Sequence, residues 1–185
     1  MNNHKTALTG LTADEISSAA GVKQKYRGKQ ILEWIIRGAV SFDEMTNLPA
    51  SLRDDLKSVS DIYSTGVRDS RADEEGTSKI LIELEDGFLI EAVLLTDERG
   101  RKTACLSSQA GCAIGCKFCR TGTMGLQRNL SAGEIIEQHL HLSRLYGPIS
   151  NIVYMGMGEP LHNTEAVIKS LKLFTDPDSW AISPR

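Results

Sequence analysis

Apolar residues in the first 60 positions of the chain recur at helical spacing. Ile31 and Ile35 lie four positions apart in the segment 26–39, and this spacing is typical of one face of an α-helix. Residues 12–15 read Thr-Ala-Asp-Glu, a capping box in which the threonine and the glutamate satisfy each other's free backbone amides. A further helix is indicated by a proline suited to a first turn and two leucines four positions apart: Pro49, Leu52 and Leu56. The pattern predicts a helical module over residues 1–63.

From residue 64 the pattern changes to one that predicts strands. Residues 79–84 and 88–95 are two runs rich in β-branched and aliphatic residues, and the sequence Glu-Asp-Gly separates them. Two such runs joined by a short turn signal are typical of a β-hairpin. We therefore expect a β-hairpin connector over residues 64–98.

One acidic residue interrupts the second of these runs. Glu91 has apolar neighbours on both sides, and strand alternation puts it on the same face as Leu89 and Val93. Two interpretations remain open. The carboxylate either reaches water at a strand edge, or points into a site where burial would raise its pKa toward that of a useful base.

Two strand–loop–helix units are predicted between residues 99 and 185. The strands are expected at 103–107 and 149–155, and the helices at 131–146 and 164–174. The second strand is apolar almost throughout, as a buried parallel strand is. Alternating strands and helices of this kind predict an α/β fold with a parallel sheet, in which functional residues gather at the carboxyl ends of the strands.

Composition narrows the class of protein. The chain has 185 residues, of which 41% are hydrophobic and 24% are charged, with a formal net charge of −3, as in ordinary globular proteins. It contains no apolar run of 18 residues, so we expect no membrane span. The polar N-terminus has no apolar segment of a secretory signal. We therefore expect a cytoplasmic protein of one or two domains.

Charge is distributed unevenly along the chain. Residues 99–133 contain six basic side chains and no acidic one, and residues 23–29 contain four basic side chains. These segments are either solvated surface, with the longer one also a basic setting for cysteine thiolates, or surfaces that face an anion such as nucleic acid. Charge alone does not separate these alternatives.

All four cysteines lie within 15 residues: Cys105, Cys112, Cys116 and Cys119. A disulfide scaffold would spread its cysteines, whereas so tight a cluster indicates metal binding or redox chemistry. The last three, spaced Cys-x3-Cys-x2-Cys, can ligate three corners of a [4Fe-4S] cluster and leave one iron open for a substrate or cofactor. Structural zinc, with Cys105 as a fourth ligand, is the alternative.

The segment from Cys112 to Cys119, with the aromatic Phe118 before its last cysteine, resembles the signature loop of radical S-adenosylmethionine (SAM) enzymes. The chain is still more similar to the RlmN-type RNA adenine methyltransferases. Five further segments carry that resemblance: residues 26–30, 42–46, 107–112, 128–130 and 155–161. It implies a helical RNA-binding accessory domain at 1–63, the connector at 64–98, and the first half of a radical SAM partial (β/α) barrel at 99–185.

The resemblance also implies cofactors and residue roles. Cys112, Cys116 and Cys119 would ligate the cluster, whose open iron would chelate SAM. Phe118, Gly158 and Glu159 match SAM-binding positions; a glycine permits close backbone approach, and a carboxylate accepts hydrogen bonds from the ammonium group of SAM.

Two further positions match catalytic residues of the family. Cys105 would resolve a covalent RNA–protein intermediate, although it can also be read as a buried strand thiol. Glu91 matches the proton acceptor, at a spacing from Cys105 one residue longer than expected.

The implied function is methylation of adenine C2 in 23S rRNA and tRNA, with an electron donor such as flavodoxin and no membrane partner. Such enzymes need a second catalytic cysteine near their C-terminus and form a disulfide bond with it, but no cysteine follows Cys119. We therefore expect an N-terminal part of a longer enzyme, inactive alone. Two alternatives remain: a Cfr-type adenine C8 methyltransferase, and a non-catalytic protein that binds an Fe–S cluster or RNA.

Overall fold

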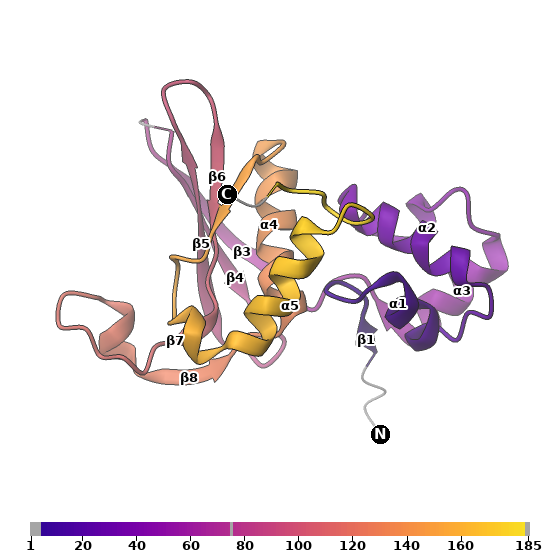
Figure 1. The fold of residues 1–185 in the computed structure, drawn as a ribbon, viewed down its shortest axis with the longest axis horizontal. Coiled ribbons are helices and arrows are strands. Elements are labelled where there is room, and N and C mark those ends of the chain that lie inside the picture. The colour runs from indigo at the N-terminus through magenta and orange to yellow at the C-terminus, as the bar shows by residue number, and fades with distance from the viewer. Residues whose placement is uncertain (1–4, 75, 184–185) are drawn as a thin grey trace.

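The computed structural model describes residues 5–74 and 76–183. The chain forms two parts, a helical module at the N-terminus and a five-stranded sheet with two long helices (Figure 1). The helix α4, Ala132–Tyr146, stands between the sheet and the module (Figure 1). The class is mixed α/β, as the sequence predicts.

Short helices and one pair of short strands make up the N-terminal module. These elements are β1 (Thr6–Ala7), α1 (Ala13–Ala19), α2 (Lys25–Ile36), η1 (Phe42–Glu44), α3 (Ala50–Val59) and β2 (Ser60–Asp61). The predicted capping box is present, because Thr12 N donates to Glu15 Oε2 at 2.8 Å and Glu15 N donates to Thr12 Oγ1 at 3.3 Å. Pro49 is the N-cap of α3 and lies just before its first residue.

The sheet is antiparallel over four strands and parallel at one edge. Its order is β3 (Gly66–Ala72), β4 (Ser78–Glu83), β5 (Leu89–Thr96), β6 (Lys102–Cys105) and β9 (Asn151–Val153). The β4–β5 pair is the predicted hairpin. Within this sheet only β6 and β9 run parallel, with Ala104 opposite Ile152. The edge strand β3 is an element that the sequence pattern did not reveal.

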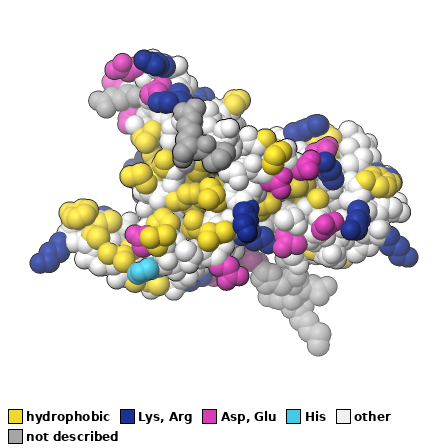
Figure 2. Space-filling view, in the orientation of Figure 1, with side chains coloured by type: hydrophobic (Ala, Val, Ile, Leu, Met, Phe, Trp, Pro, Cys, Tyr) yellow, Lys and Arg dark blue, Asp and Glu magenta, His cyan; other side chains and the backbone are white. Residues whose placement is uncertain are grey.

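The two faces of this sheet differ in their surroundings. One face is buried in the core with the inward residues of α4 and includes Ile80, Ile82, Ile90 and Leu94. The other face is open, with Leu95 exposed and the remaining side chains of β5 on that face exposed or half-buried. In the view of Figure 2, hydrophobic side chains gather over the sheet, whereas charged and polar side chains cover the helical module.

The strand expected at 149–155 differs from its prediction. Regular strand structure covers only Asn151–Val153, its residues are half-buried, and Met155 is 79% exposed. The strand is parallel to β6, as predicted, but it lies at the sheet edge and is not enclosed on both sides. An apolar run alone does not distinguish a central strand from an edge strand, because the neighbour that would cover it lies elsewhere in sequence.

A smaller sheet leads from β6 into α4. The strand β7 (Gln109–Gly111) pairs antiparallel with β8 (Leu126–Asn129), and residues 112–125 between them form a long excursion that we call the cysteine loop. Three elements complete the fold: η2 (Thr121–Met124), η3 (Pro160–His162) and α5 (Thr164–Thr175). No helix in the described part of the chain is both long and apolar enough to span a membrane.

Candidate functional site

The cysteine loop begins and ends at a close backbone contact. Cys112 N donates to Gly125 O at 3.0 Å, and a Cβ atom on Gly111 would lie 1.9 Å from that same oxygen. Gly111 also has a φ of 76°, which glycine adopts most readily. The loop therefore leaves the β7–β8 pair at a fixed point, with Cys112 buried at its base.

The other two loop cysteines are half-buried and close in sequence. Cys119 N donates to Cys116 O at 3.0 Å, so the two residues belong to one tight turn. Hydrogen bonds from the backbone amides of Gly122 and Thr121 lower the pKa of the Cys119 thiol. The thiolate is the form that binds iron. Phe118 lies between these cysteines, with 94% of its surface exposed.

The donor set of the loop fits an iron–sulfur cluster. Soft thiolates are the ligands that Fe–S clusters take, and three of them come from this single segment. Among residues 5–74 and 76–183, no three His, Cys, Asp or Glu side chains are arranged to hold a single metal ion. All four cysteines are free thiols. A cluster would therefore require Cys112, Cys116 and Cys119 to draw together within the loop.

The glycine-rich turn after β9 packs against the chain between β6 and β7. A Cβ atom on Gly156 would lie 2.7 Å from Ser107 Oγ, and one on Gly158 would lie 2.6 Å from Gln109 Cβ. Met157 O accepts from the backbone amide of Ser108 at 2.8 Å. The close approach expected for Gly158 is thus made to the chain itself. It holds the turn beside β7, the strand that leads to Cys112.

Glu159 lies at the outer end of this turn. Its amide donates to Gln109 Oε1 at 2.9 Å, and its Oε1 accepts from the amide of Leu161 at 3.1 Å. The carboxylate thereby caps η3 and stays half-exposed. The structure brings Gly158 and Glu159 next to the strand that carries the first loop cysteine, whereas Phe118 projects into solvent.

The two predicted catalytic residues share the open face of the main sheet. Cys105 pairs with Val93 across β5 and β6, two positions from Glu91 on the same face. Burial raises the pKa of the Cys105 thiol. The Glu91 side chain is 44% exposed and pairs with Lys79 Nζ at 2.9 Å. This placement agrees with the interpretation of a carboxylate that reaches water.

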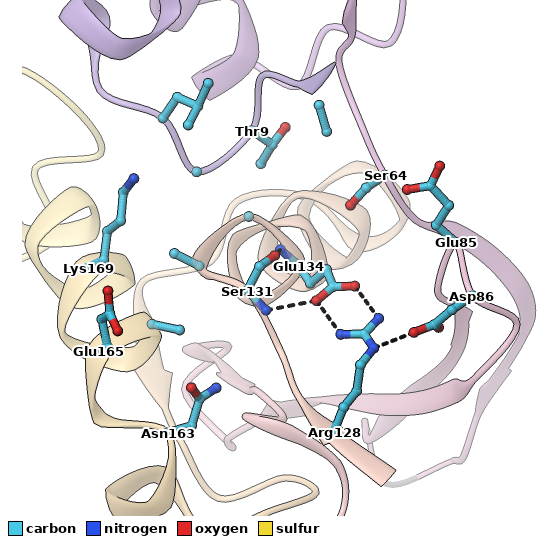
Figure 3. Close-up of a pocket in the computed structure, with 16 residues that line it drawn as sticks. Thr9, Ser64, Glu85, Asp86, Arg128, Ser131, Glu134, Asn163, Glu165 and Lys169 are labelled. Atoms are coloured by element: carbon cyan, nitrogen blue, oxygen red, sulfur yellow. Dashed lines mark hydrogen bonds and ion pairs between the residues drawn. The ribbon is translucent and has the colours of Figure 1, made fainter. Parts of the chain in front are cut away.

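A charged network missed by the sequence analysis ties β8 to α4. Arg128 donates to Glu134 through two bonds of 2.6 and 2.9 Å and also pairs with Asp86 (Figure 3). Glu134 holds the N-terminus of α4 as the partner of Ser131 in the second predicted capping box. These groups line a groove of about 720 Å³ beside the N-terminal module. Arg128 is therefore held by carboxylates and does not project freely toward an anion.

A second buried polar cluster joins the linker after the module to α4. Glu137 accepts from Ser64 N at 2.9 Å and from Thr65 Oγ1 at 2.6 Å, and burial raises its pKa to about 7. Thr65 Oγ1 also lies 2.9 Å from His141 Nε2. No local signal could reveal this cluster, because its two sides are more than 70 positions apart.

Comparison with known proteins finds a matching domain family and close relatives of this chain. Residues 8–62 match the family of the ribosomal RNA large subunit methyltransferase N-terminal domain. The chain is 48% identical over 185 residues to the probable dual-specificity RNA methyltransferase RlmN of Treponema denticola, covering 100% of this chain and 53% of the relative. It is 42% identical over 184 residues to the dual-specificity RNA methyltransferase RlmN of Geotalea uraniireducens, covering 98% of this chain and 53% of that relative.

A solved structure shares the fold. The crystal structure of a radical SAM methyltransferase from Sphaerobacter thermophilus superposes with a TM-score of 0.87 at 39% sequence identity, over 96% of this chain and 54% of that one. The chain thus spans about half the length of the relatives it matches. The identity along the chain and the common fold confirm the resemblance inferred from the cysteine loop: along its length this chain is similar to about half of each RlmN protein, and it shares the fold of a radical SAM methyltransferase.

Proposed function

We propose that this chain is the cluster- and SAM-binding portion of an RNA methyltransferase that modifies adenine C2 in 23S rRNA and in tRNA. One observation carries the proposal: three cysteines at Cys-x3-Cys-x2-Cys spacing leave β7 in one loop, beside the glycine-rich turn. The RNA substrate class follows from the relatives, which are named as dual-specificity RNA methyltransferases.

The cofactor roles fall to residues of the loop and the turn. Cys112, Cys116 and Cys119 would hold a [4Fe-4S] cluster, which together with SAM supplies a 5′-deoxyadenosyl radical when both are bound. The Glu159 carboxylate would accept hydrogen bonds from the SAM ammonium group, at the end of a turn that Gly158 fixes against β7. Phe118, exposed at the loop tip, offers an aromatic face for the adenine ring.

Two residues of the open sheet face would act on the RNA. Burial raises the pKa of the Cys105 thiol, so a base would have to deprotonate it before it acts. The thiolate would then attack the sulfur that joins the second catalytic cysteine to the RNA: a disulfide forms, the sulfur–carbon bond breaks, and the released carbon takes up a proton. Glu91, on the same face, would accept a proton from the RNA once Lys79 is displaced. Both assignments place the adenine over this face.

The partners follow from the same proposal. Exposed basic side chains of the segment 99–133, such as Lys117 and Arg120, and the basic segment 23–29 would face RNA phosphates, whereas Arg128 is held by Glu134 and Asp86. A reductant protein such as flavodoxin would supply electrons to the cluster. An enzyme that modifies ribosomal and transfer RNA works in the cytoplasm, where we place this protein.

Iron binding tests the cluster assignment directly. Anaerobic reconstitution of the chain with iron and sulfide should give a brown protein with about four irons per chain. Replacing Cys112, Cys116 or Cys119 by alanine should each remove the colour and the iron, because three ligands are the minimum for this cluster. Iron content and the visible absorption spectrum are the measurements.

Cys105→Ala is the matched control, since it removes a thiol of the same chain outside the loop. It should keep the full iron content. If the unmodified chain took up no iron but held one zinc tightly, and Cys105→Ala lost that zinc, the cluster would be overturned and a four-cysteine zinc site favoured.

The alternatives differ in their products. A Cfr-type enzyme would place the methyl group at adenine C8, and mass spectrometry of the modified adenosine separates C8 from C2. A non-catalytic protein that binds an Fe–S cluster would take up iron but would not cleave SAM after reduction, and one that binds only RNA would do neither. Reductive cleavage of SAM to 5′-deoxyadenosine by the reconstituted chain therefore favours the enzyme over the binding protein.

A further inference from the structure

An exposed tyrosine in the first turn of α2 has an arginine on one face of its ring. Tyr26 is 56% exposed, and the Cζ atom of Arg27 lies 4.8 Å from the centroid of its ring. Within the described part of the chain, Tyr26 belongs neither to the buried core nor to the half-buried side chains packed against it. The ring therefore adds nothing to the core, and the face that Arg27 does not cover is open to a ligand.

Arg27 is held in place by the rest of the module. Its Nη1 donates to Gln30 Oε1 at 2.8 Å and to Asn47 O at 3.3 Å. Asn47 is fixed in turn, because its Oδ1 accepts from Trp34 Nε1 at 2.7 Å. A side chain that is ordered before its ligand arrives loses less conformational entropy on binding. The stacked pair of Tyr26 and Arg27 is thus a preorganised surface that offers a flat ring face.

The charge beside this ring is positive. Residues 16–32 contain no acidic residue. Lys23 and Lys25 precede Tyr26, are exposed, and form no ion pair with any described carboxylate. An aromatic face next to uncompensated cations is the combination with which proteins bind single-stranded nucleic acid, because it matches both the bases and the phosphates.

We propose that an unpaired RNA base stacks on the open face of Tyr26, with Lys23 and Lys25 beside the phosphates of the same strand. Every base has a flat face, so such a contact tolerates different sequences. In Figure 1, α2 and the cysteine loop lie at opposite ends of the molecule. The stacked base is therefore a different nucleotide from the adenine that would be modified. The choice of RNA as the ligand rests on the proposed function.

Fluorescence anisotropy with a short, dye-labelled single-stranded RNA and the full chain tests the stacked base. Tyr26→Ala should weaken binding about tenfold, the effect of losing one stacked base. Tyr26→Phe keeps the ring and should bind as the unmodified chain does. An RNA of the same length with abasic nucleotides should bind the unmodified chain and Tyr26→Ala equally, since it has no base to stack.

Salt dependence separates stacking from phosphate contact. Tyr26→Ala should leave the slope of log affinity against log salt concentration unchanged, because no charge is lost. Lys23→Ala and Lys25→Ala should each reduce that slope by about 0.7, the value for one phosphate contact on a single strand.

Val59→Ala is the matched control, because it removes an exposed apolar side chain from the last residue of α3 in the same module. It should bind RNA as the unmodified chain does. The site would be overturned by an unmodified chain that binds no RNA, by unchanged affinity in Tyr26→Ala, or by an equal loss in Val59→Ala. Equal weakening of the abasic RNA by Tyr26→Ala would overturn it too.

The proposed function is judged by a separate readout. Tyr26→Ala should take up iron and cleave SAM as the unmodified chain does, because the cysteine loop lies at the other end of the molecule (Figure 1). A chain that binds RNA through Tyr26 but cleaves no SAM would contradict the proposed enzyme and support the stacking site. A chain that cleaves SAM but binds RNA equally well without the Tyr26 ring would overturn the stacking site alone.

Discussion

Gly158 meets two structural demands at one residue. Its φ of 99° lies in the region that L side chains rarely adopt, and its Cα faces the backbone amide and side chain of Gln109. The first demand is conformational and applies at any such turn. The second is packing, and it depends on β7, almost 50 positions earlier in the chain. This residue therefore fixes the position of Glu159 relative to the strand that leads into the cysteine loop.

Replacing Gly158 by alanine should destabilise the chain by about 2–4 kcal/mol, since backbone strain and overpacking act together. Gly38→Ala is the control, because Gly38 has a φ of 85° but open space where the Cβ would lie. It should lose only about 1 kcal/mol, the share due to strain. Urea unfolding measures both free energies. Equal losses would show that the contact with Gln109 contributes nothing.

At the scale of elements, the sequence predicts structure where the signal is local. Both capping boxes and the β4–β5 hairpin are encoded within a few residues, and all three are present. The strand β3 reads Gly-Val-Arg-Asp-Ser-Arg-Ala, which has little apolar alternation. It forms a strand because its backbone pairs with the edge of β4. The β7–β8 pair is likewise not predicted from the sequence, because the whole cysteine loop separates its two short strands.

The junction of β8 and α4 depends on a single arginine. Arg128→Ala should destabilise the chain by about 3 kcal/mol, because Glu134 has a side chain only 8% exposed and would lose its counter-charge. Arg68→Ala is the matched control, since Arg68 pairs with Glu83 where both side chains are exposed. It should cost at most about 1 kcal/mol. Thermal or urea unfolding of the two variants gives the comparison, and equal losses would refute the role of burial.

At the scale of the whole molecule, the sequence predicts residues of the candidate site only where those residues are close together in the chain. The three loop cysteines lie within eight positions, so their spacing alone indicated a cluster. The contacts that join the module to the sheet lie far apart in the chain, such as Glu137 with Ser64. These contacts form only when the chain folds, so periodicity and motifs do not predict them.

Another such contact brings two glycines together. A Cβ atom on Gly10 would lie 2.4 Å from the Cα of Gly133, and one on Gly133 would lie 2.6 Å from Thr9 O. Gly133 is in the first turn of α4, and the loop that carries Gly10 belongs to the N-terminal module. The module can thus rest on the helix that follows the cysteine loop only because neither residue has a side chain.

This contact predicts a reversal of the usual effect of a glycine-to-alanine change. In a helix, alanine is normally more favourable than glycine by about 1 kcal/mol. Gly133→Ala should instead destabilise the chain by about 1–3 kcal/mol, because its methyl group would push residues 8–11 away from α4. The loosened module should also expose the linker at residues 62–66 to proteases, since cleavage follows local opening.

Gly66→Ala provides the control. Gly66 lies at the start of β3 beside the same linker, its φ is not positive, and nothing lies within 4 Å of where its Cβ would be. This variant should match the unmodified chain in unfolding free energy and in protease resistance, or exceed it slightly through the restricted unfolded state. If Gly133→Ala proved as stable and as resistant as Gly66→Ala, the module would not be held by the glycine contact. The ion pairs Glu15–Lys169 and Lys29–Asp178 would then be the contacts that set its position.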